Sequence, residues 1–431
     1  MAFGVRHFVA ATALVAAAAY TAFFGRLDSI PQIRSDGYSY YVYLPSVFLY
    51  HDVTLERLAN DWYGGPYPDF TGIRRWPSTG RWLNLHPIGT AILMTPFFVV
   101  ADLLSRWSNL PRDGFSLYYQ HGAALAGLAY FLFGLALLRR MLREQFSDGV
   151  VLATLICITW GTNLFHYGVF DSTFSHAYAF CVVCLWVWLV ERWWDRPTLA
   201  RSLALGGVAA LNVLIRHTNA IYVLVLPLYR IVHWPDVVAR AVELRDRWRM
   251  LALAAATGFV VLVPQFALYK WITGAFFVNP YVTHGMGFSF ESPHLLDVLF
   301  STQKGLFFWS PVLLLSVAGV FVATGRERAL VLPAVVVFAI QTILIATWSQ
   351  WQFGASFGHR GFTDGFALAA PFIASSLAWT VRHRRALPLL AIGTTAAVLL
   401  SVAQMVQYWI GVLPMADTTW AQYRELFLRF R

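Results

Sequence analysis

The chain has 431 residues, of which 58% are hydrophobic and only 13% are charged, whereas soluble proteins carry about 25% charged residues. That charge deficit excludes an ordinary soluble enzyme. The formal net charge is +10, but the basic residues lie at the ends of apolar segments and form no long run, so they do not indicate a nucleic-acid partner. The composition predicts an integral membrane protein.

Apolar stretches of about 20 residues, the length that crosses a bilayer, recur along the whole chain. We predict about eleven spans, at 7–25, 118–138, 149–168, 174–191, 200–215, 218–235, 250–269, 305–324, 329–347, 363–381 and 386–411. No internal repeat and no soluble domain is visible. We therefore expect residues 1–431 to form one integral membrane domain, an all-α polytopic transmembrane helix bundle.

Arginines cluster in five short loops between these stretches, and such loops stay cytoplasmic. The five loops alternate correctly with a cytoplasmic amino end only if the apolar stretch 86–104 does not cross completely. We therefore expect 86–104 to be an interfacial or re-entrant segment within a long outer loop, 26–117, that carries amphipathic helices. The arginines are Arg139, Arg140 and Arg143; Arg192, Arg196 and Arg201; Arg240, Arg245, Arg247 and Arg249; Arg326 and Arg328; Arg382, Arg384 and Arg385.

Two acids are candidates for chemistry at the outer face. Asp36 lies in the polar cluster 34–45 after the first span, and Asp171 is the only acid between Asp148 and Glu191. Desolvation at a membrane surface raises the pKa of a carboxyl group and fits it for general-base work. For each acid the alternative is a helix N-cap, because an Asp before an apolar helix can accept hydrogen bonds from free backbone N–H groups.

Basic side chains at the outer loops are candidates for binding a phosphate group. Arg216 and Arg360 have no acid beside them in the sequence, and the guanidinium fork matches phosphate oxygens. Lys304 is a weaker candidate. A distant acid such as Glu291 or Asp364 is the alternative partner for either arginine.

Aromatic and imidazole side chains around these charges are candidate substrate contacts. Aromatic rings can stack on sugar C–H faces, although tryptophans in outer loops are equally typical of interfacial anchors. The sequence has no nucleotide-binding loop, hydrolase elbow or zinc motif, which favours a lipid-borne substrate. The candidates are Tyr38, Tyr41, His86, His176, Trp351 and His359.

These features resemble the polytopic C-type glycosyltransferases, which include protein mannosyltransferases and the aminoarabinose and galacturonic acid transferases of lipid A. In Ser35-Asp36-Gly37-Tyr38, Asp36 looks like the acid that these enzymes place soon after their first span. The segment 85–89 resembles the proline-containing turn late in their first loop, and Asp171 falls where they place a second outer acid. Many relatives have adjacent acids in the first loop, whereas here Gly37 follows Asp36.

The resemblance implies transfer of a sugar from a polyprenyl-phosphate carrier to a lipid or glycan acceptor. Asp36 would be the general base and Asp171 its helper, and a divalent cation held by these two acids is left open. We expect a bacterial inner membrane location with the active site facing the periplasm. Two alternatives remain: a transporter or flippase of a lipid-linked saccharide, and an O-antigen polymerase or ligase that works through arginine and histidine.

Overall fold

The computed structural model describes residues 4–25 and 31–431, so the first residues of the predicted outer loop, 26–30, lie outside the described residues. The described chain is mostly helical, as predicted. Its one sheet is a short antiparallel hairpin, β1 (Ile73–Arg75) and β2 (Trp82–Asn84), in which Arg74 pairs with Leu83. This hairpin is the departure from the predicted all-α fold.

The elements between α1 and α6 belong to the predicted outer loop. They are α2 (Asp36–Tyr41), α3 (Tyr43–Phe48), α4 (Glu56–Tyr63), η1 (Asp69–Thr71), the hairpin and α5 (Gly89–Trp107). The bundle consists of α1 (Phe8–Phe24), α6 (Leu117–Arg143), α7 (Asp148–Trp160), α8 (Leu164–Val169), α9 (Ser175–Asp195), α10 (Leu199–Ile215), η2 (His217–Leu224), α11 (Val225–Leu228), α13 (Trp248–Thr273), α15 (Leu306–Trp309), η4 (Pro311–Leu313), α16 (Leu314–Val322), α18 (Val331–Ala346), η5 (Arg360–Gly365), α19 (Phe366–Arg382) and α20 (Leu387–Trp409). The connections carry α12 (Trp234–Asp246), η3 (Pro280–His284), α14 (Leu295–Phe300), α17 (Gly325–Arg328) and α21 (Trp420–Leu426).

Six helical segments in the described chain are long and apolar enough to cross a membrane: α5, α6, α9, α13, η5 with α19, and α20. Five of them coincide with predicted spans, while α5 covers the stretch that we expected not to cross. The other predicted spans appear as shorter apolar helices. The prediction of eleven spans is therefore not confirmed.

Local chemistry explains two of the shorter helices. The predicted span 149–168 is divided between α7 and α8 by Gly161-Thr162-Asn163, a segment rich in turn-forming residues. The predicted span 305–324 is divided at Ser310-Pro311, because proline has no N–H to continue the helical ladder. Hydropathy located both apolar segments but did not reveal the breaks within them.

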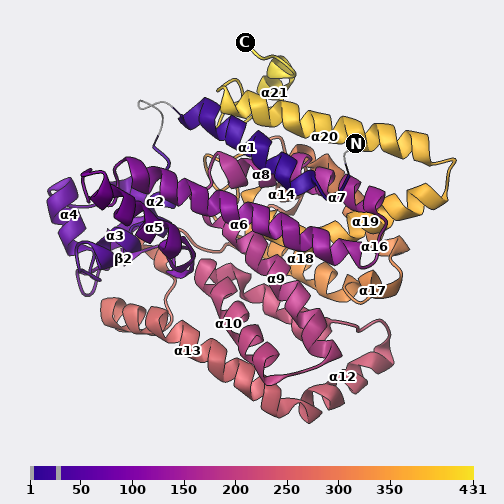
Figure 1. Cartoon of the computed structure of the whole chain (residues 1–431), viewed down its shortest axis with the longest axis horizontal. Coiled ribbons are helices and arrows are strands. Elements are labelled where there is room, and N and C mark those ends of the chain that lie inside the picture. Colours follow the sequence, from indigo (N-terminus) through magenta and orange to yellow (C-terminus); the bar gives the residue numbers. More distant parts are fainter. Residues whose placement is uncertain (1–3, 26–30) are drawn as a thin grey trace.

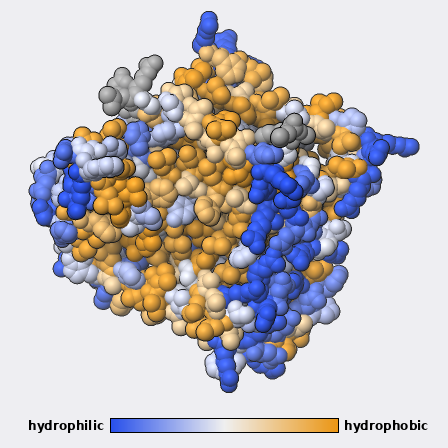
Figure 2. All heavy atoms as spheres, viewed as in Figure 1, coloured by the Kyte–Doolittle hydropathy of each residue, from blue (hydrophilic) through white to orange (hydrophobic). Residues whose placement is uncertain are grey.

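The elements segregate toward two ends of the bundle. Figure 1 shows α2 to α5 and β2 gathered at the left, while α12 and α17 lie at the right, with α6 and α20 running lengthwise between them. Figure 2 shows apolar residues across the middle of this face and hydrophilic residues toward its left and right edges. An apolar band between polar ends is the surface expected of a protein that sits in a bilayer.

Ion pairs bring several arginine-bearing loops to the same end. Glu144, after α6, accepts hydrogen bonds from Arg192 and from Arg326, the latter at 2.8 Å. Arg139 donates to the backbone oxygen of Arg6 at 3.1 Å, which places the amino end of α1 beside the end of α6. Three of the five arginine clusters and the amino end therefore share one end of the bundle, the arrangement that the predicted topology requires.

Helix α5 lies against the end of α10 and the start of α6, which are the predicted outer ends of these two bundle helices. A Cβ atom on Gly89, at its start, would lie 2.4 Å from the backbone carbon of Leu214 in the last turn of α10. Near its other end, Ala101 contacts Gly122 in the second turn of α6. Both ends of α5 thus lie near the outer loops, which favours an interfacial segment, and the predicted placement stays a prediction.

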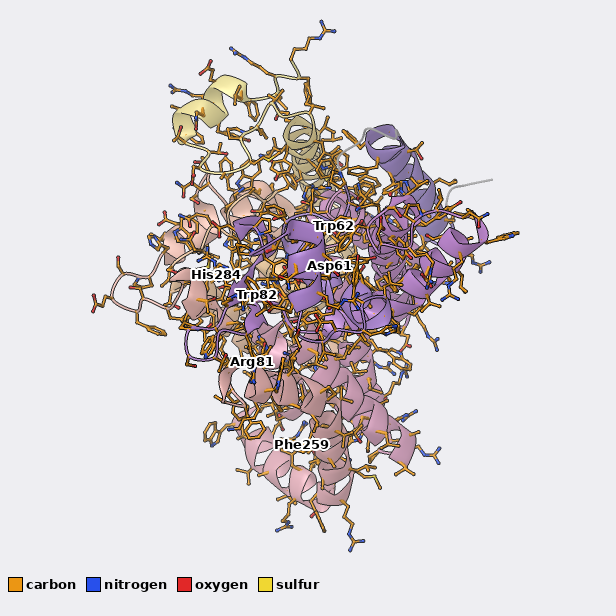
Figure 3. All side chains as sticks on the ribbon, turned by 90° about the vertical axis from the view of Figure 1, so that its left-hand side faces the viewer. Asp61, Trp62, Arg81, Trp82, Phe259 and His284 are labelled. Atoms are coloured by element: carbon orange, nitrogen blue, oxygen red, sulfur yellow. The ribbon has the colours of Figure 1, made fainter. Side chains whose placement is uncertain are left out.

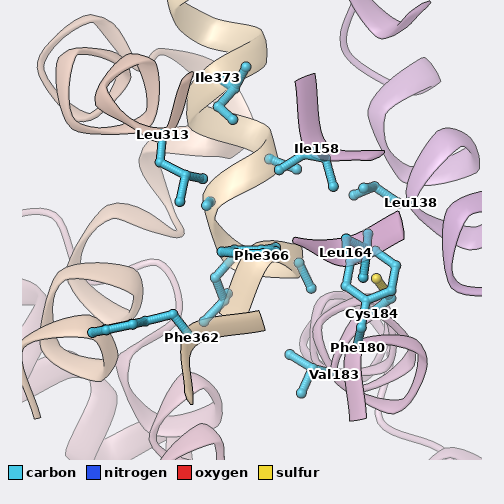
Figure 4. Packing of buried hydrophobic residues seen from close by; sticks show 14 of the residues in the cluster. Leu138, Ile158, Leu164, Phe180, Val183, Cys184, Leu313, Phe362, Phe366 and Ile373 are labelled. Atoms are coloured by element: carbon cyan, nitrogen blue, oxygen red, sulfur yellow. The ribbon is translucent and has the colours of Figure 1, made fainter. Parts of the chain in front are cut away.

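The centre of the bundle is a continuous apolar core around α9 and α19. Figure 4 shows Phe366 and Ile373 of α19 in the same packed region as Ile158 of α7 and Phe180 of α9. A Cβ atom on Gly319 of α16 would lie 1.9 Å from the backbone oxygen of Phe372, so a glycine there permits close packing of helix on helix. Helices α9 and α19 of this core carry η5 and the start of α9 to the end of the bundle that holds the predicted outer loop.

Candidate active site

The first feature of the site is the close approach of α2 to the start of α9. A Cβ atom on Gly37 would lie 2.2 Å from the hydroxyl oxygen of Thr173, so no larger residue fits without movement. Gly37 thereby lets Asp36 reach the bundle. Many of the resembled enzymes have a second acid directly beside the first one in this loop. In this chain an acidic side chain at position 37 would collide with Thr173.

Asp36 forms an ion pair with Arg360 from η5, with 2.6 Å between Oδ2 and Nη1. Burial alone would raise the pKa of Asp36, but Arg360, together with His86 and His176, holds that pKa below its ordinary value. The carboxylate is therefore ionised at neutral pH. The alternative N-cap role is not what the structure shows, because Asp36 is the first residue of α2 and its carboxylate faces Arg360.

A second charged group lies nearby. Asp364, which is fully buried, accepts hydrogen bonds from Arg216 and from His176, each at 3.2 Å. Of the two distant partners considered for the arginines, Asp364 is therefore the one that neutralises Arg216. Arg216 and Arg360 both have acid partners that their local sequence does not reveal, and neither is a free cation.

Asp171 has a different environment from Asp36. Its Oδ1 accepts a hydrogen bond from Arg34 at 2.7 Å, and its Oδ2 lies 2.9 Å from Nε2 of His166. Because Trp409 donates its indole N–H to Nδ1 of His166 at 2.8 Å, Nε2 carries the proton and donates to Asp171. Asp171 thus ties the first outer loop to α8, and its side chain does not cap α9.

Lys304 and His359 lie close enough to Arg360 for its charge to lower the pKa of each. The Lys304 ammonium donates to the backbone oxygens of Ser356 and Met415, and burial lowers its pKa to about 7. His359 is 2% exposed, and neither ring nitrogen has a hydrogen-bond partner among the described residues. Burial, with Lys304 and Arg360 nearby, lowers the pKa of His359 to about 3, so its imidazole is neutral.

His86, a candidate substrate contact, lies beside α2. Its Nδ1 lies 2.8 Å from the hydroxyl of Ser39, and its ring centroid lies 4.1 Å from that of Tyr40. Burial lowers the pKa of His86 to about 4, against the opposing effect of Asp36. This imidazole is therefore also neutral.

Three of the predicted substrate contacts are buried away from the paired charges. Tyr38 stacks on Phe115, with 5.7 Å between ring centroids. Both belong to a second apolar cluster, here called the outer-loop core, which is built mainly from buried side chains of residues 33–126. Tyr41 belongs to the same core, and its hydroxyl donates to Gly114 at 2.6 Å. Trp351 is 4% exposed and stacks on the His294 ring, which leaves little surface for a sugar. The structure does not bring these three to Asp36.

Two tyrosines not anticipated from the sequence lie among the charges instead. Tyr40 interacts electrostatically with Arg216 and Asp36, and Tyr281 of η3 interacts with the same two groups. Burial raises the pKa of both phenols, so they are neutral hydrogen-bond donors. Helical spacing could have revealed Tyr40, because residue i+4 shares a helix face with Asp36. No comparable signal identifies Tyr281.

The hairpin contacts η3 and the end of α13 beside this cluster. Arg74 of β1 donates to the backbone oxygen of Thr283 at 3.2 Å, and Arg81 stacks on Trp271 at the end of α13, 4.6 Å from the ring centroid. Figure 3 looks onto this end, with Arg81, Trp82 and His284 near the middle of the view. These contacts fix the predicted outer loop to the end of α13 and to η3.

The predicted divalent cation has no cluster of three or more ligating side chains in the described parts of the chain. Both oxygens of Asp171 and one oxygen of Asp36 already have protein partners. A metal shared by these acids would have to displace Arg34 or His166 from Asp171, so the divalent cation stays a prediction.

No protein-family model matches this chain, and a search of the curated proteins finds no match. The resemblance to the C-type glycosyltransferases therefore depends on the sequence features given above.

Proposed function

We propose that this protein is a membrane glycosyltransferase that moves a sugar from a polyprenyl-phosphate carrier to a lipid or glycan acceptor. The observation that carries the proposal is the pair of Asp36 and Arg360 at the end of the bundle that holds the predicted outer loop. A general base and a phosphate-binding cation are the two groups that such a transfer requires.

Asp36 is suited to accept the proton of an acceptor hydroxyl. Its side chain is 31% exposed, and Oδ1 has no hydrogen-bond partner among the described residues. In the proposed step the acceptor proton passes to Asp36 as the acceptor oxygen attacks the anomeric carbon. The bond between that carbon and the phosphate oxygen breaks, and the phosphate leaves with the electron pair.

Arg360 is suited to stabilise the departing phosphate. Its guanidinium lies between the rings of Phe174 and Phe353, at 5.6 and 5.7 Å from their centroids, and these rings fix its position beside Asp36. Negative charge on the leaving oxygen grows during the reaction, and a fixed guanidinium in a partly buried site stabilises that charge more than water does. Arg216 and the neutral phenols of Tyr40 and Tyr281 lie close enough to contribute further donors.

The donor would enter from the lipid. A polyprenyl chain stays in the bilayer, so its phosphate reaches the site sideways at the level of the head groups. The long helix α13 is apolar, and only 11% of its most apolar 18-residue segment is buried inside the protein. A lipid-facing helix that ends beside the first outer loop gives such a carrier an apolar surface along which to approach.

The test is transfer by the purified protein in nanodiscs supplied with a panel of polyprenyl-phosphate sugars and a lipid extract. The proposal expects a glycosylated lipid, detected by mass spectrometry, and no product with Asp36→Asn. Movement of the intact donor between leaflets of proteoliposomes, without product, would support the flippase. Transfer that survives loss of Asp36 and Asp171 but not of Arg216 or Arg360 would support the polymerase or ligase.

A further inference from the structure

Arg360 has unused hydrogen-bonding capacity. A guanidinium carries five N–H donors, yet among the described residues its one hydrogen-bond acceptor is Asp36, reached through Nη1. The side chain is 13% exposed, so few of the other donors can be satisfied by bulk water. The remaining donors are available to a ligand.

The surroundings of Arg360 favour an anion as that ligand. Lys304, Arg360 and Arg216 all act electrostatically on His359, and among the described residues the only carboxylate paired with Arg360 is Asp36. The His359 ring is buried with both nitrogens unpaired among the described residues. Buried polar groups without partners are rare in folded proteins, and a phosphate oxygen would accept a hydrogen bond from the N–H of this ring.

We propose that the donor phosphate takes the place of Asp36 on Arg360, so that binding of the donor releases the base that the reaction needs. This inference rests on the proposed function and adds a regulation to it. In the resting protein Asp36 acts as the counter-ion of Arg360. Once the phosphate is bound, the carboxylate is free to turn toward the acceptor.

The exchange changes the basicity of Asp36. Groups from every neighbouring element face this carboxylate: Arg360 of η5, His86 after β2, His176 of α9, Tyr40 of α2 and Tyr281 of η3. The largest effect that lowers the pKa of Asp36 is the charge of Arg360, and burial acts in the opposite direction. When the negative charge of the donor phosphate neutralises Arg360, the lowering effect of Arg360 is lost and the pKa of Asp36 rises. Asp36 is then a stronger base in the donor complex than in the resting protein.

The first test is the affinity of the full-length protein in nanodiscs for farnesyl phosphate, which carries no sugar. Because Asp36 competes with the phosphate, Asp36→Asn should tighten binding roughly tenfold, the lower end of the coupling between a carboxylate and an adjacent guanidinium. In an Arg360→Gln background the same change should have no effect. Asp61→Asn is the matched control, since Asp61 pairs with Arg57 on the exposed helix α4 (Figure 3).

The second test uses the unaltered protein, so it does not depend on a variant that folds. Calorimetry of farnesyl phosphate binding at about pH 6, in buffers of different ionisation enthalpy, measures protons taken up on binding. The phosphate of farnesyl phosphate itself titrates at about pH 6, and its proton release on binding is common to both proteins. We therefore expect the parent protein to take up more protons, or release fewer, than Asp36→Asn.

Three results would overturn the exchange: farnesyl phosphate that does not bind, an Asp36→Asn variant that binds it no more tightly, or the same proton uptake in parent and variant. Each of these can occur whether or not the protein transfers sugar. Conversely, tighter binding by Asp36→Asn with no transfer from any donor would retain the phosphate exchange and reject the glycosyltransferase.

Discussion

Asp171 and Arg34 form a 2.7 Å ion pair across 137 residues of sequence, which joins the loop before α9 to the first outer loop. His166 holds the other oxygen of the same carboxylate. A carboxylate held on both sides and only 10% exposed is first of all a structural connection. Its role as helper to Asp36 would be exerted through the position of α2.

We expect Asp171→Asn to destabilise the protein. Burial would raise the pKa of Asp171, but the His166 hydrogen bond and the Arg34 charge lower it to about 2. A lowered folded-state pKa gives stability of about 2 kcal/mol that is fully present above pH 4 and is lost as the pH falls through 2. Thermal unfolding in detergent at pH 7 should show the loss, whereas Asp195→Asn, at an exposed pair with Arg230, should change little. Equal melting temperatures for Asp171→Asn and the parent would refute this structural role.

Gly37→Ala tests the close approach of α2 to α9. The added methyl group would lie 2.2 Å from the Thr173 hydroxyl, and overpacking of this kind costs about 1–3 kcal/mol. We expect lower thermal stability and weaker sugar transfer, because Asp36 moves away from Arg360. Gly65→Ala is the control, since a Cβ there meets nothing within 4 Å. A Gly37→Ala protein as stable and active as Gly65→Ala would show that the contact is unimportant.

Arg216→Met tests whether Arg216 is needed as a counter-ion. Asp364 is fully buried, and removal of one partner of a buried pair costs about 3–5 kcal/mol because the other charge is left uncompensated. The melting temperature should fall sharply and should recover partly in the double variant Arg216→Met with Asp364→Asn. Arg216→Lys should stay folded, so its affinity for farnesyl phosphate reports on phosphate binding alone. If Arg216→Met melts like the parent, the hydrogen bond from His176 is sufficient for Asp364 and Arg216 is not needed as a counter-ion.

The position of α5 is tested by labelling a single cysteine at position 112 with a membrane-impermeant reagent. Arg112 lies after α5 and pairs with Asp102 at 2.9 Å. We expect labelling of intact cells, because the predicted orientation puts both ends of α5 outside. A cysteine at position 326 should be labelled only after permeabilisation. If position 112 also needs permeabilisation, α5 is a true span and the orientation has to be revised.

The sequence predicted the class of the fold because hydropathy and arginine position are set by the bilayer along the whole chain. It did not predict which apolar segments form continuous helices. Breaks such as those at Gly161 and Pro311 depend on packing and on single residues within long apolar runs. The hairpin at 73–84 was missed because each strand has only three residues, too few for a period-two pattern to stand out.

The charged members of the site were largely identified from the sequence, since an ionisable residue at a membrane face is costly and therefore conspicuous. Which acid pairs with which arginine was harder to predict. Nothing local connects Asp36 with Arg360, and Asp364 was considered only as one of two distant partners. The aromatic residues were the least predictable: Tyr38 and Tyr41 lie in the outer-loop core and Tyr40 lies in the site, a distinction made by helix orientation.

The most direct test of the glycosyltransferase proposal is the initial rate of sugar transfer by Asp36→Asn, measured in nanodiscs with a donor that the parent protein uses. The substitution keeps the size of the side chain and removes its basicity. The account predicts a folded variant whose rate falls by roughly two to four orders of magnitude. A folded Asp36→Asn protein that transfers sugar at the parental rate would contradict it.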